Sequence, residues 1–254
     1  MLEASELSTG YRKKVLLKNI SLTLKPGNLS MLIGPNGSGK TTLIHALARV
    51  MPAHSGEVRL NDRLLSSYKT KALARQLALL PQVRKIPDLD VETLTAQGRY
   101  PHHGYFSSLS SSDEDKIDYA LKRCGIDHLR KRNLTTLSGG ERQRAYLAML
   151  LAQDADLMLL DEPTTFLDIS QQLEILDLLR ELCAQGKTIL TVLHDLSLAL
   201  RYADTLFLLN NGDLIGEYTA DGLINSGKLK DVFGVCVHSF CDGGDSFVGF
   251  STKP

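Results

Sequence analysis

The chain has 254 residues, which is long enough for one large domain, or for a core with a smaller insert, and for a full hydrophobic core. Lys and Arg together number 29, as do Asp and Glu, so the formal net charge is zero and the chain as a whole offers no electrostatic match to nucleic acid. Tryptophan is absent, and the composition is that of a soluble globular protein. The N-terminal segment shows no secretory signal, and no run approaches the roughly 18 apolar residues that a membrane span needs, so we expect a cytosolic protein that could still dock on a membrane protein.

The first third of the chain is predicted to be rich in β-structure. The segment NISLTLKPG (19–27) alternates apolar and polar residues and ends in a Pro-Gly turn, which is typical of a half-buried strand. The continuous apolar run that starts at Leu29 predicts a second, buried strand. Apolar residues then recur at helical spacing until Pro52 ends the helix. The segment GEVRLNDR (56–63) predicts a strand that runs into an Asn-Asp turn.

The middle of the chain, residues 83–154, is predicted to be mainly helical. Ser112 or Asp113 is expected to cap a helix with an acidic first turn, which Gly125 closes. The last third returns to alternating strands and helices, and an Asn-Gly hairpin turn at 211–212 follows the last long strand. The elements predicted there are the strand LMLLD, a helix at 171–183, the strand TILTVL, a helix at 196–202 and the strand TLFLL.

Buried apolar strands separated by local helices predict a parallel sheet that is covered on both faces. In such a sheet a ligand binds at the carboxyl ends of the strands, so the residues that follow each strand indicate the function. A polar side chain suited to magnesium, phosphate or water follows each of four apolar strands, LSMLI (29–33), LALLP (77–81), LMLL (157–160) and TILTVL (188–193). These side chains are Lys40 in a glycine loop, Gln82, the pair Asp161 and Glu162, and His194.

The segment GPNGSGKT (34–41) fits the phosphate-binding pattern G-x-x-x-x-G-K-[ST] and lies between a predicted strand and a predicted helix, as the mechanism requires. Its glycines let the backbone curl so that N–H groups face phosphate oxygens. Lys40 is expected to reach the β- and γ-phosphates, and Thr41 offers a hydroxyl to Mg²⁺. A chance glycine-rich turn is the plain alternative, but a chance match in the chain has a probability on the order of 1%. The residues predicted to bind the nucleotide here are Gly34, Pro35, Asn36, Gly37, Ser38, Gly39, Lys40, Thr41 and Thr42.

Two acidic residues that end the strand LMLLD are predicted to serve the same site. Asp161 is the expected direct or indirect ligand of Mg²⁺, and Glu162 beside it can act as general base toward the attacking water. A strand that ends in two acids is ordinary by itself, and the phosphate loop gives the pair its meaning. His194, at a strand end next to Asp195, is predicted to be catalytic rather than structural.

A second candidate anion site lies far along the chain from the first. In TTLSGGERQRAYLAML (135–150) a serine and two glycines precede a long apolar helical run. This arrangement leaves N–H groups without partners at a helix N-terminus, which favours an anion. A capped turn with no ligand is the plain alternative. The pattern raises the question why one chain carries two phosphate sites.

Together these residues resemble the ATP-binding subunit of ABC transporters, and the resemblance covers nearly the whole chain. It rests on the phosphate loop, on LSGGE (137–141, called the signature below), on LMLLDEP and on LHD with His194, in the order typical of the family. The resemblance implies an α/β P-loop NTPase fold with a RecA-like core, an N-terminal antiparallel β subdomain and an inserted helical subdomain. It also implies ATP and Mg²⁺ as cofactors and ATP hydrolysis as the activity, because no motif position is degenerate.

The resemblance extends the set of site residues and divides the chain. Tyr11 is an aromatic A-loop candidate that would contact the nucleotide, Gln82 would act in catalysis and on Mg²⁺, and Asp168 ends the TTFLD motif and is expected at the nucleotide. A single ABC ATPase domain is implied for residues 1–254. Its parts are a core (1–82 and 155–225), a helical subdomain with the signature (83–154) and a C-terminal tail (226–254).

The same resemblance explains the second phosphate site. Two subunits of this family pack head to tail, so that the signature of one closes over the ATP held by the phosphate loop of the other. Ser138, Gly139 and Gly140 would bind the γ-phosphate of the partner's nucleotide, where a helix N-terminus suits the developing charge. The implied first partner is therefore a second copy of the chain.

Two segments narrow the resemblance to the ATPases of iron-chelate importers, which handle siderophores, haem and cobalamin. They are LTAQGRYPHHGYF (94–106) and LKDVFGVCV (229–237). The implied function is ATP-driven import of an iron(III) chelate through membrane permease subunits, with a substrate-binding protein as an indirect partner, no nucleic acid, and a peripheral place on the cytoplasmic side of the membrane. Residues 83–104 would form the groove for the permease's coupling helix, with Arg99, Tyr100 and His102 among the contacts.

Other functions stay open at this point. An ABC ATPase that imports cobalamin or a metal ion would share the same motifs. A non-transport ABC ATPase for iron–sulfur cluster assembly would have a similar length, and only the GRYPHHG segment argues against it. The sequence does not identify the chelate or the permease.

The cysteines give little functional information. Cys124 and Cys183 share helix faces with apolar residues and are predicted to be small core residues. Cys236, His238 and Cys241 lie close together in the sequence, but a fourth ligand and the usual Cys-x-x-Cys spacing are lacking, so they make a weak candidate for a metal site.

Overall fold

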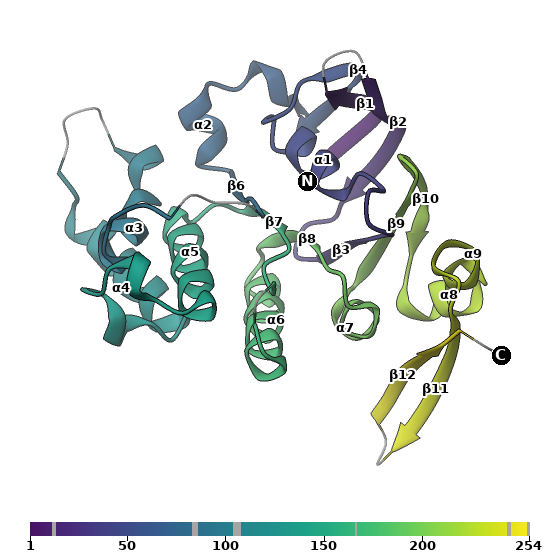
Figure 1. The fold of residues 1–254 in the computed structure, drawn as a ribbon. Helices are drawn as coiled ribbons and strands as arrows, with labels where there is room; N and C mark the ends of the chain where they lie inside the picture. The colour runs from purple at the N-terminus through teal and green to yellow at the C-terminus, as the bar shows by residue number, and fades with distance from the viewer. Residues whose placement is uncertain (12–13, 83–85, 104–107, 166, 243–244, 253–254) are drawn as a thin grey trace. The chain divides into compact units, whose positions relative to one another are not determined.

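The computed structural model describes residues 1–11, 14–82, 86–103, 108–165, 167–242 and 245–252. They fall into two compact units, Met1–Ser66 with Leu190–Pro254 and Ser67–Ile189 (Figure 1). The predicted subdivision into core, helical subdomain and tail stays a prediction. Residues 83–85 and 104 of the predicted groove, and Phe166 of the TTFLD motif, lie outside the described residues.

The first unit contains an antiparallel sheet in the strand order β2-β1-β4-β5. Because side chains alternate across a strand, the apolar residues Ile20, Leu22 and Leu24 of β2 are buried, as predicted. Asn61 and Asp62, both with positive φ, make the predicted turn after β4. This sheet confirms the N-terminal antiparallel subdomain. The strands are β1 (Leu2–Tyr11), β2 (Lys14–Leu24), β4 (Ala53–Leu60) and β5 (Arg63–Leu64).

The same unit also contains a pair of parallel strands, which confirms the α/β prediction. β3 (Leu29–Ile33) is buried along its whole length and pairs in parallel with β9 (Thr205–Asn210). The chain then turns at 211–212, where both residues have positive φ, into the antiparallel β10 (Asp213–Tyr218). This is the Asn-Gly hairpin that the sequence predicted.

Two helices of the first unit flank the strands that lead to the predicted site. α1 (Lys40–Leu47) begins directly after the phosphate loop and packs against β1 and β2. β8 (Thr188–Val192), of which Leu190 to Val192 belong to this unit, leads through a short turn into α7 (Leu196–Tyr202), whose bounds agree with the prediction. α7 packs against β3.

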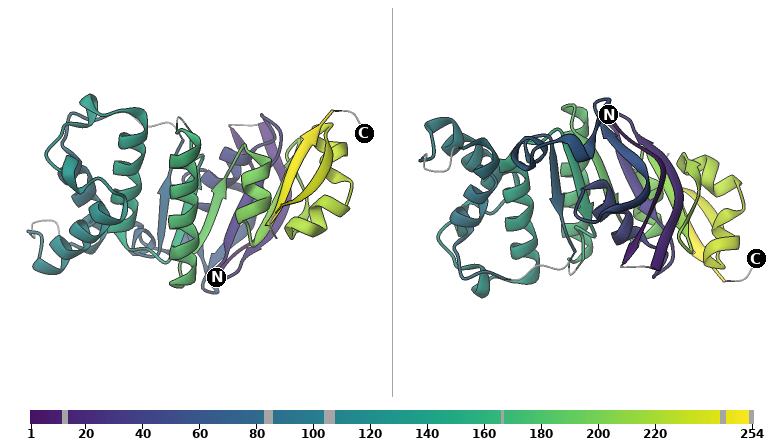
Figure 2. Two further views of the ribbon diagram at one scale, coloured as in Figure 1. Left: turned by 90° about the horizontal axis from the view of Figure 1, so that it is seen from below. Right: turned by 90° about the horizontal axis from the view of Figure 1, so that it is seen from above.

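The first unit ends in two short helices and a β-hairpin, which lie together in Figures 1 and 2. The hairpin packs on α7, where Ser197 Oγ donates a hydrogen bond of 3.3 Å to the carbonyl oxygen of Val248. His238 Nε2 lies 2.7 Å from Ser251 Oγ across the hairpin. Among the described side chains, which do not include that of Cys241, no group of three or more His, Cys, Asp or Glu is arranged to hold a metal ion. The elements are α8 (Ala220–Asn225), α9 (Lys228–Phe233), β11 (Cys236–Asp242) and β12 (Asp245–Ser251).

The second unit is mainly helical, as predicted for the middle of the chain, and contains one parallel strand pair. β6 (Leu77–Leu80) pairs with β7 (Leu157–Asp161). The helices α3, α4 and α5 pack on one another and form the teal bundle of Figures 1 and 2. The helices are α2 (Thr70–Ala74), α3 (Val91–Gln97), α4 (Ser111–Arg123), α5 (Gly139–Gln153) and α6 (Ile169–Ala184), with 3-10 turns η2 (Tyr100–His102), η3 (Asp127–Leu129) and η4 (Leu134–Thr136). The 3-10 turn η1 (Leu65–Ser67) spans the sequence boundary between the two units.

The start of α4 differs from the prediction, because Ser110 is the N-cap rather than Ser112 or Asp113. The Ser110 hydroxyl accepts a hydrogen bond from the Asp113 N–H at 3.3 Å, and the Ser110 N–H donates to Asp113 Oδ2 at 2.9 Å, which completes a capping box. Each of the three serines at 110–112 has an acidic residue three positions later, so spacing alone does not choose between them. The long-range bond from Arg99 to Asp113 selects the first.

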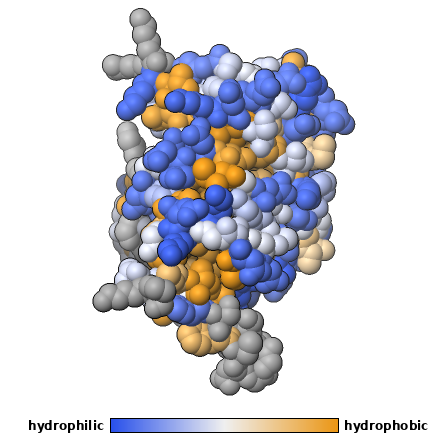
Figure 3. All heavy atoms as spheres, turned by 90° about the vertical axis from the view of Figure 1, so that its right-hand side faces the viewer, coloured by the Kyte–Doolittle hydropathy of each residue, from blue (hydrophilic) through white to orange (hydrophobic). Residues whose placement is uncertain are grey.

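Apolar side chains fill both units. Cys124 and Cys183 are buried, as predicted, and burial raises the pKa of the Cys124 thiol to about 12. The face drawn in Figure 3 is largely hydrophilic, with apolar atoms showing in several places among charged and polar ones. Within the part of the chain that the structure describes, no helix combines the length and the apolar character needed to cross a membrane.

Candidate nucleotide-binding site

The phosphate loop lies in the first unit, between β3 and α1. Gly34, Gly37 and Gly39 have φ angles of 156°, 78° and 107°, a range that L side chains rarely adopt. A Cβ atom at Gly34 would lie 2.1 Å from the carbonyl oxygen of Leu209, so the close approach of β9 also requires glycine there. The first N–H groups of α1 have no partner within the helix, and they give the end of the loop its affinity for anions.

Lys40 is held across the phosphate loop. Its side chain is 6% exposed, and its Nζ donates hydrogen bonds of 2.7 and 2.9 Å to the carbonyl oxygens of Gly34 and Pro35. The Ser38 hydroxyl is buried and has no hydrogen-bond partner among the described residues. A phosphate group would offer acceptors to both the ammonium and the hydroxyl, so the chemistry of the loop fits a nucleotide polyphosphate.

Two further predicted residues belong to the first unit. Tyr11 ends β1, and its side chain is 55% exposed. His194 is exposed in the turn between β8 and α7. Asp195 caps α7 by accepting a hydrogen bond of 3.0 Å from the Leu198 N–H, and this cap fixes the path of the chain at His194.

The predicted magnesium ligand and the predicted base lie in the second unit, at the end of β7. Asp161 is fully buried and Glu162 nearly so. Glu162 has a φ of 54°, which is uncommon for a residue other than glycine, and its Oε2 accepts a hydrogen bond of 3.1 Å from Thr165 Oγ1. Two adjacent carboxylates out of contact with bulk solvent fit a hard cation such as Mg²⁺. Thr41, which was predicted to offer its hydroxyl to Mg²⁺, lies in the first unit, and joint coordination stays a prediction.

Gln82 and Asp168 occupy element ends in the second unit. Gln82 is exposed in the bend that follows β6. Asp168 is the N-cap of α6 and accepts hydrogen bonds of 2.8 Å from the Gln171 N–H and from the Ser170 hydroxyl. These bonds, with that of Gln171 first, hold the pKa of Asp168 below its ordinary value. The sequence predicted Asp168 as a nucleotide contact, and capping α6 is a role that it missed.

The signature forms the start of α5. Ser138 is the N-cap: its hydroxyl accepts a hydrogen bond of 3.2 Å from the Glu141 N–H, and its own N–H donates to Glu141 Oε2 at 2.8 Å. The bond from the Ser138 N–H is the main reason that the pKa of Glu141 is lowered. Ser138 and Gly139 are exposed, whereas Gly140 is buried with its Cα facing Gln171. The exposed pair thus stands at the positive end of the α5 dipole.

The predicted site residues divide between the two units, and how the two sets join in one site stays a prediction. The first unit holds Tyr11, the loop 34–42 and His194. The second unit holds Gln82, Ser138, Gly139, Gly140, Asp161, Glu162 and Asp168.

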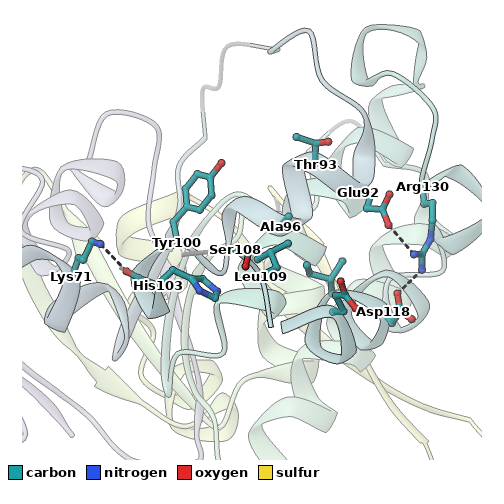
Figure 4. A pocket seen from close by; sticks show the side chains of 12 residues that line it. Lys71, Glu92, Thr93, Ala96, Tyr100, His103, Ser108, Leu109, Asp118 and Arg130 are labelled. Atoms are coloured by element: carbon teal, nitrogen blue, oxygen red, sulfur yellow. Dashed lines mark hydrogen bonds and ion pairs between the residues drawn. The ribbon is translucent and has the colours of Figure 1, made fainter. Parts of the chain in front are cut away.

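A pocket of about 1200 Å³ opens in the second unit, between α3, η2 and α4 (Figure 4). Arg130 lies at one side, where its Nη1 donates to Glu92 Oε1 at 2.9 Å and its Nη2 donates to Asp118 Oδ1 at 2.7 Å. The α3 and η2 walls come from the described part of the predicted permease groove. The α4 wall was missed, because no sequence pattern pairs 108–118 with 92–103. The lining residues are Lys71, Glu92, Thr93, Ala96, Tyr100, His103, Ser108, Leu109, Glu114, Ile117, Asp118 and Arg130.

The three residues predicted to contact the permease have different surroundings. Tyr100 is 63% exposed and lines the pocket, so it remains a candidate. Arg99 is only 7% exposed and is paired with the buried Asp113 at 2.8 Å, so the prediction that its side chain lies on a docking surface is wrong. His102 Nε2 lies 2.9 Å from the carbonyl oxygen of Gln153, so the His102 ring also points toward α5. The sequence pattern showed a basic, aromatic segment but not the partners of its side chains.

A sequence model of the ABC transporter family matches residues 17–165, which is more than half of the chain. The chain belongs to the ABC transporter family. The achromobactin transport ATP-binding protein CbrD of Dickeya dadantii is 44% identical over 230 residues, which cover 90% of this chain and 86% of that protein. The ferric enterobactin transport ATP-binding protein FepC of Escherichia coli is 41% identical over 237 residues, covering 92% and 87%.

Solved structures of ABC transporters have the same fold. A chain from the structure of a metal-chelate type ABC transporter in an inward-facing conformation aligns with a TM-score of 0.85 at 26% identity, covering 98% of this chain and 96% of that one. The ATP-binding cassette MJ0796, a dimer in a post-hydrolysis state with ADP and Pi, aligns with a TM-score of 0.76 at 24% identity, covering 87% and 99%. At that identity the second similarity speaks for the fold alone.

Proposed function

We propose that the chain is the ATP-hydrolysing subunit of an importer that carries an iron(III) chelate, a siderophore or haem, through a partner membrane permease. The observation that carries the proposal is the loop that holds Lys40 across its own carbonyl groups, in a chain about 40% identical to importer subunits named for achromobactin and ferric enterobactin. A subunit of this kind works on the cytoplasmic side of the membrane, as a peripheral protein.

In the proposed reaction, the phosphate loop and Lys40 bind the β- and γ-phosphates of ATP. The exposed side chain of Tyr11 contacts the adenine ring of ATP. Thr41, Asp161 and Gln82 would hold Mg²⁺, which would neutralise phosphate charge as it develops. Glu162 accepts a proton from the attacking water while the bond between the γ-phosphorus and the bridging oxygen breaks, giving ADP and phosphate.

His194 and Asp168 complete the proposed site from two helix starts. His194 precedes the cap of α7 and would donate a hydrogen bond to a phosphate oxygen or to the attacking water. Asp168 caps α6, and the hydrogen bonds of this cap lower the pKa of its carboxyl. His194 would be placed by the cap next to it and Asp168 by its own capping bonds, since a capped helix start leaves the chain little freedom.

A second copy of the chain would complete each site. Ser138 and Gly139 are exposed at the N-terminus of α5, so they are available to the nucleotide of a partner, as a head-to-tail dimer requires. One chain has one phosphate loop and one signature, and two copies give two sites.

The pocket between α3, η2 and α4 is the surface that we assign to the permease. It combines apolar lining from Ala96, Leu109 and Ile117 with the charged pairs of Arg130, which suits a short amphipathic segment of a partner. The exposed Tyr100 at its edge offers the large, rigid contact area that interfaces favour.

The proposal is tested by uptake of ⁵⁵Fe-labelled chelates in cells that lack the chain and are complemented with variants. The wild-type chain should restore uptake of one chelate class among hydroxamate siderophores, catecholate siderophores and haem. Lys40→Ala should not, because the loop loses the charge that binds the nucleotide. Lys25→Ala is the matched control, an exposed lysine whose ammonium forms a surface ion pair with Glu217. Uptake of every chelate without the chain, or restoration by Lys40→Ala, would contradict the proposal.

A further inference from the structure

The segment 98–103 directly follows α3. It is attached to the C-terminal end of α5. This is the opposite end of the helix from the signature. Gly98 approaches α5 so closely that an added Cβ would lie 2.2 Å from the carbonyl oxygen of Met149. Its φ is not positive, so glycine is required here by contact and not by backbone conformation.

Arg99 makes the central contacts of the segment. Its Nη1 donates a hydrogen bond of 2.7 Å to the carbonyl oxygen of Ala152 in the last turn of α5. Its Nε donates to Asp113 Oδ1 at 2.8 Å, and Asp113 completes the capping box of α4. One buried guanidinium therefore joins the end of α5 to the start of α4.

His102 and Gln153 extend the attachment. His102 Nε2 lies 2.9 Å from the carbonyl oxygen of Gln153. Because a carbonyl oxygen can only accept a hydrogen bond, the ring nitrogen is the donor. The Gln153 side chain donates in turn to the carbonyl oxygens of Ala74 at 2.6 Å and Leu77 at 3.2 Å. Leu77 begins β6, the strand that leads to Gln82.

These contacts suit the end of a helix. The last carbonyl groups of a helix have no partner within it and carry partial negative charge, which cations and N–H donors stabilise. The donors here come from a segment that also supplies two pocket-lining residues, Tyr100 and His103. On the far side, the Lys71 ammonium donates to the carbonyl oxygen of His103 at 2.9 Å, as Figure 4 shows.

We infer that Arg99 and His102 are positioning residues that fix the wall of the docking pocket to the end of α5, so that a displacement of the signature changes the pocket. The inference rests on the proposed function, in which ATP draws the signature of one subunit onto the nucleotide of another. α5 is a continuous helix of 15 residues, so a shift of its N-terminal end as a rigid body also moves its C-terminal end. The path therefore runs from Ser138 through α5 to Arg99 and His102, and from there to Tyr100 and His103.

The test places an environment-sensitive fluorophore in the pocket. The label is attached to Thr93→Cys, an exposed lining residue of α3, in a chain with Glu162→Gln to retain ATP and with Cys236→Ser and Cys241→Ser to direct the label. Emission is followed as ATP and Mg²⁺ are added, and binding of a fluorescent ATP analogue is measured on the same proteins. We expect ATP to change the emission in this parent protein.

The variants separate positioning from general stability. His102→Phe and Arg99→Met should reduce the emission change by about fivefold, within the range that substitutions along a coupling network produce, while affinity for ATP stays near that of the parent. His102→Gln keeps a donor for the Gln153 carbonyl and should rescue the response. Arg123→Met breaks an ion pair with Glu181 elsewhere in the same unit and should leave the response intact. If Arg99→Met does not fold, the His102 pair carries the test alone.

The outcomes distinguish this inference from the proposed function. Absence of ATP binding in the parent protein would remove the proposed function and this inference with it. ATP binding with no change in emission, or a full change in His102→Phe, would overturn the inference and leave the ATPase proposal standing. A change that is lost in His102→Phe and kept in His102→Gln would support it.

Discussion

Gln143 Nε2 donates a hydrogen bond of 2.6 Å to the carbonyl oxygen of Pro163, the residue that follows Glu162. Gln143 lies in the second turn of α5, and it is buried. The helix that begins at the signature is thus bonded to the turn that presents the proposed base. Both residues of this bond belong to the second unit, and the bond forms in the chain without a nucleotide.

Gln143→Leu should lower both stability and turnover. The substitution leaves a buried carbonyl group without its side-chain donor, at a cost of about 1–3 kcal/mol, and it loosens the turn that holds Glu162. Thermal unfolding and steady-state ATP hydrolysis are the two measurements. Thr9→Val is the control, because the buried Thr9 hydroxyl also donates to a proline carbonyl, that of Pro52 at 2.8 Å, and this bond lies in the other unit. Wild-type turnover in Gln143→Leu would show that the bond does not position the base.

Glu162→Gln should bind ATP without hydrolysing it. The amide keeps the shape of the side chain and can still contact Thr165, but it cannot accept a proton from water. We expect an ATP-dependent dimer on size exclusion that persists for the length of the run. Hydrolysis at the wild-type rate would show that another group is the base.

Ser138→Arg should leave ATP binding by the isolated subunit intact and prevent closure of the dimer. The long cation would occupy the place proposed for the partner's γ-phosphate, while Lys40 lies in the other unit of the same chain. A mixture with Glu162→Gln subunits is informative, because each mixed dimer has one site with both changes and one site with neither. Recovery of hydrolysis in the mixture is the expected result, and no recovery at any ratio would count against sites shared between subunits.

The stability of the chain should fall at acidic pH partly through Asp113. Burial by itself would raise the pKa of this carboxyl, but hydrogen bonds from Ser110 and Arg99 outweigh burial and hold the pKa well below its ordinary value of 3.8. The unfolded chain therefore binds a proton at a higher pH than the folded chain does. The stabilisation is present above about pH 4 and is lost as the pH falls below it.

The measurement is the free energy of unfolding between about pH 6 and 3, taken from urea titrations. Asp113→Asn should reduce its slope against pH over the acidic part of that range. Asp115→Asn, at an exposed position of the same helix, should keep the wild-type slope. Equal slopes in the wild type and in Asp113→Asn would remove Asp113 as a source of acid sensitivity.

Local patterns predicted those parts of the fold that local physics determines. The buried run at Leu29 became β3, the helix at 196–202 has the expected bounds, and the Asn-Gly turn joins β9 to β10. In each case the signal lies in adjacent residues: a continuous apolar run, a helical period or a pair of residues that tolerate positive φ. The ABC motifs added the family, because their order along the chain is specific.

Contacts between distant residues were not predictable in the same way. Arg99 reads as a surface residue of a basic, aromatic segment, yet its partners are Asp113 and the carbonyl oxygen of Ala152. The cap of α4 was misplaced for the same reason, because a long-range ion pair chose between three equivalent serines. The α4 wall of the pocket likewise depends on packing between helices, which a single sequence does not reveal.

Gly98 gives the joint between α3 and α5 an unusual mechanical property. Even a methyl group has no room between Gly98 and the carbonyl of Met149. The two backbones are therefore in direct contact, with no side chain between them. Side chains absorb small displacements by changing rotamer, whereas a close-packed backbone contact is nearly incompressible. A shift of α5 that is too small to change side-chain rotamers would therefore still displace α3.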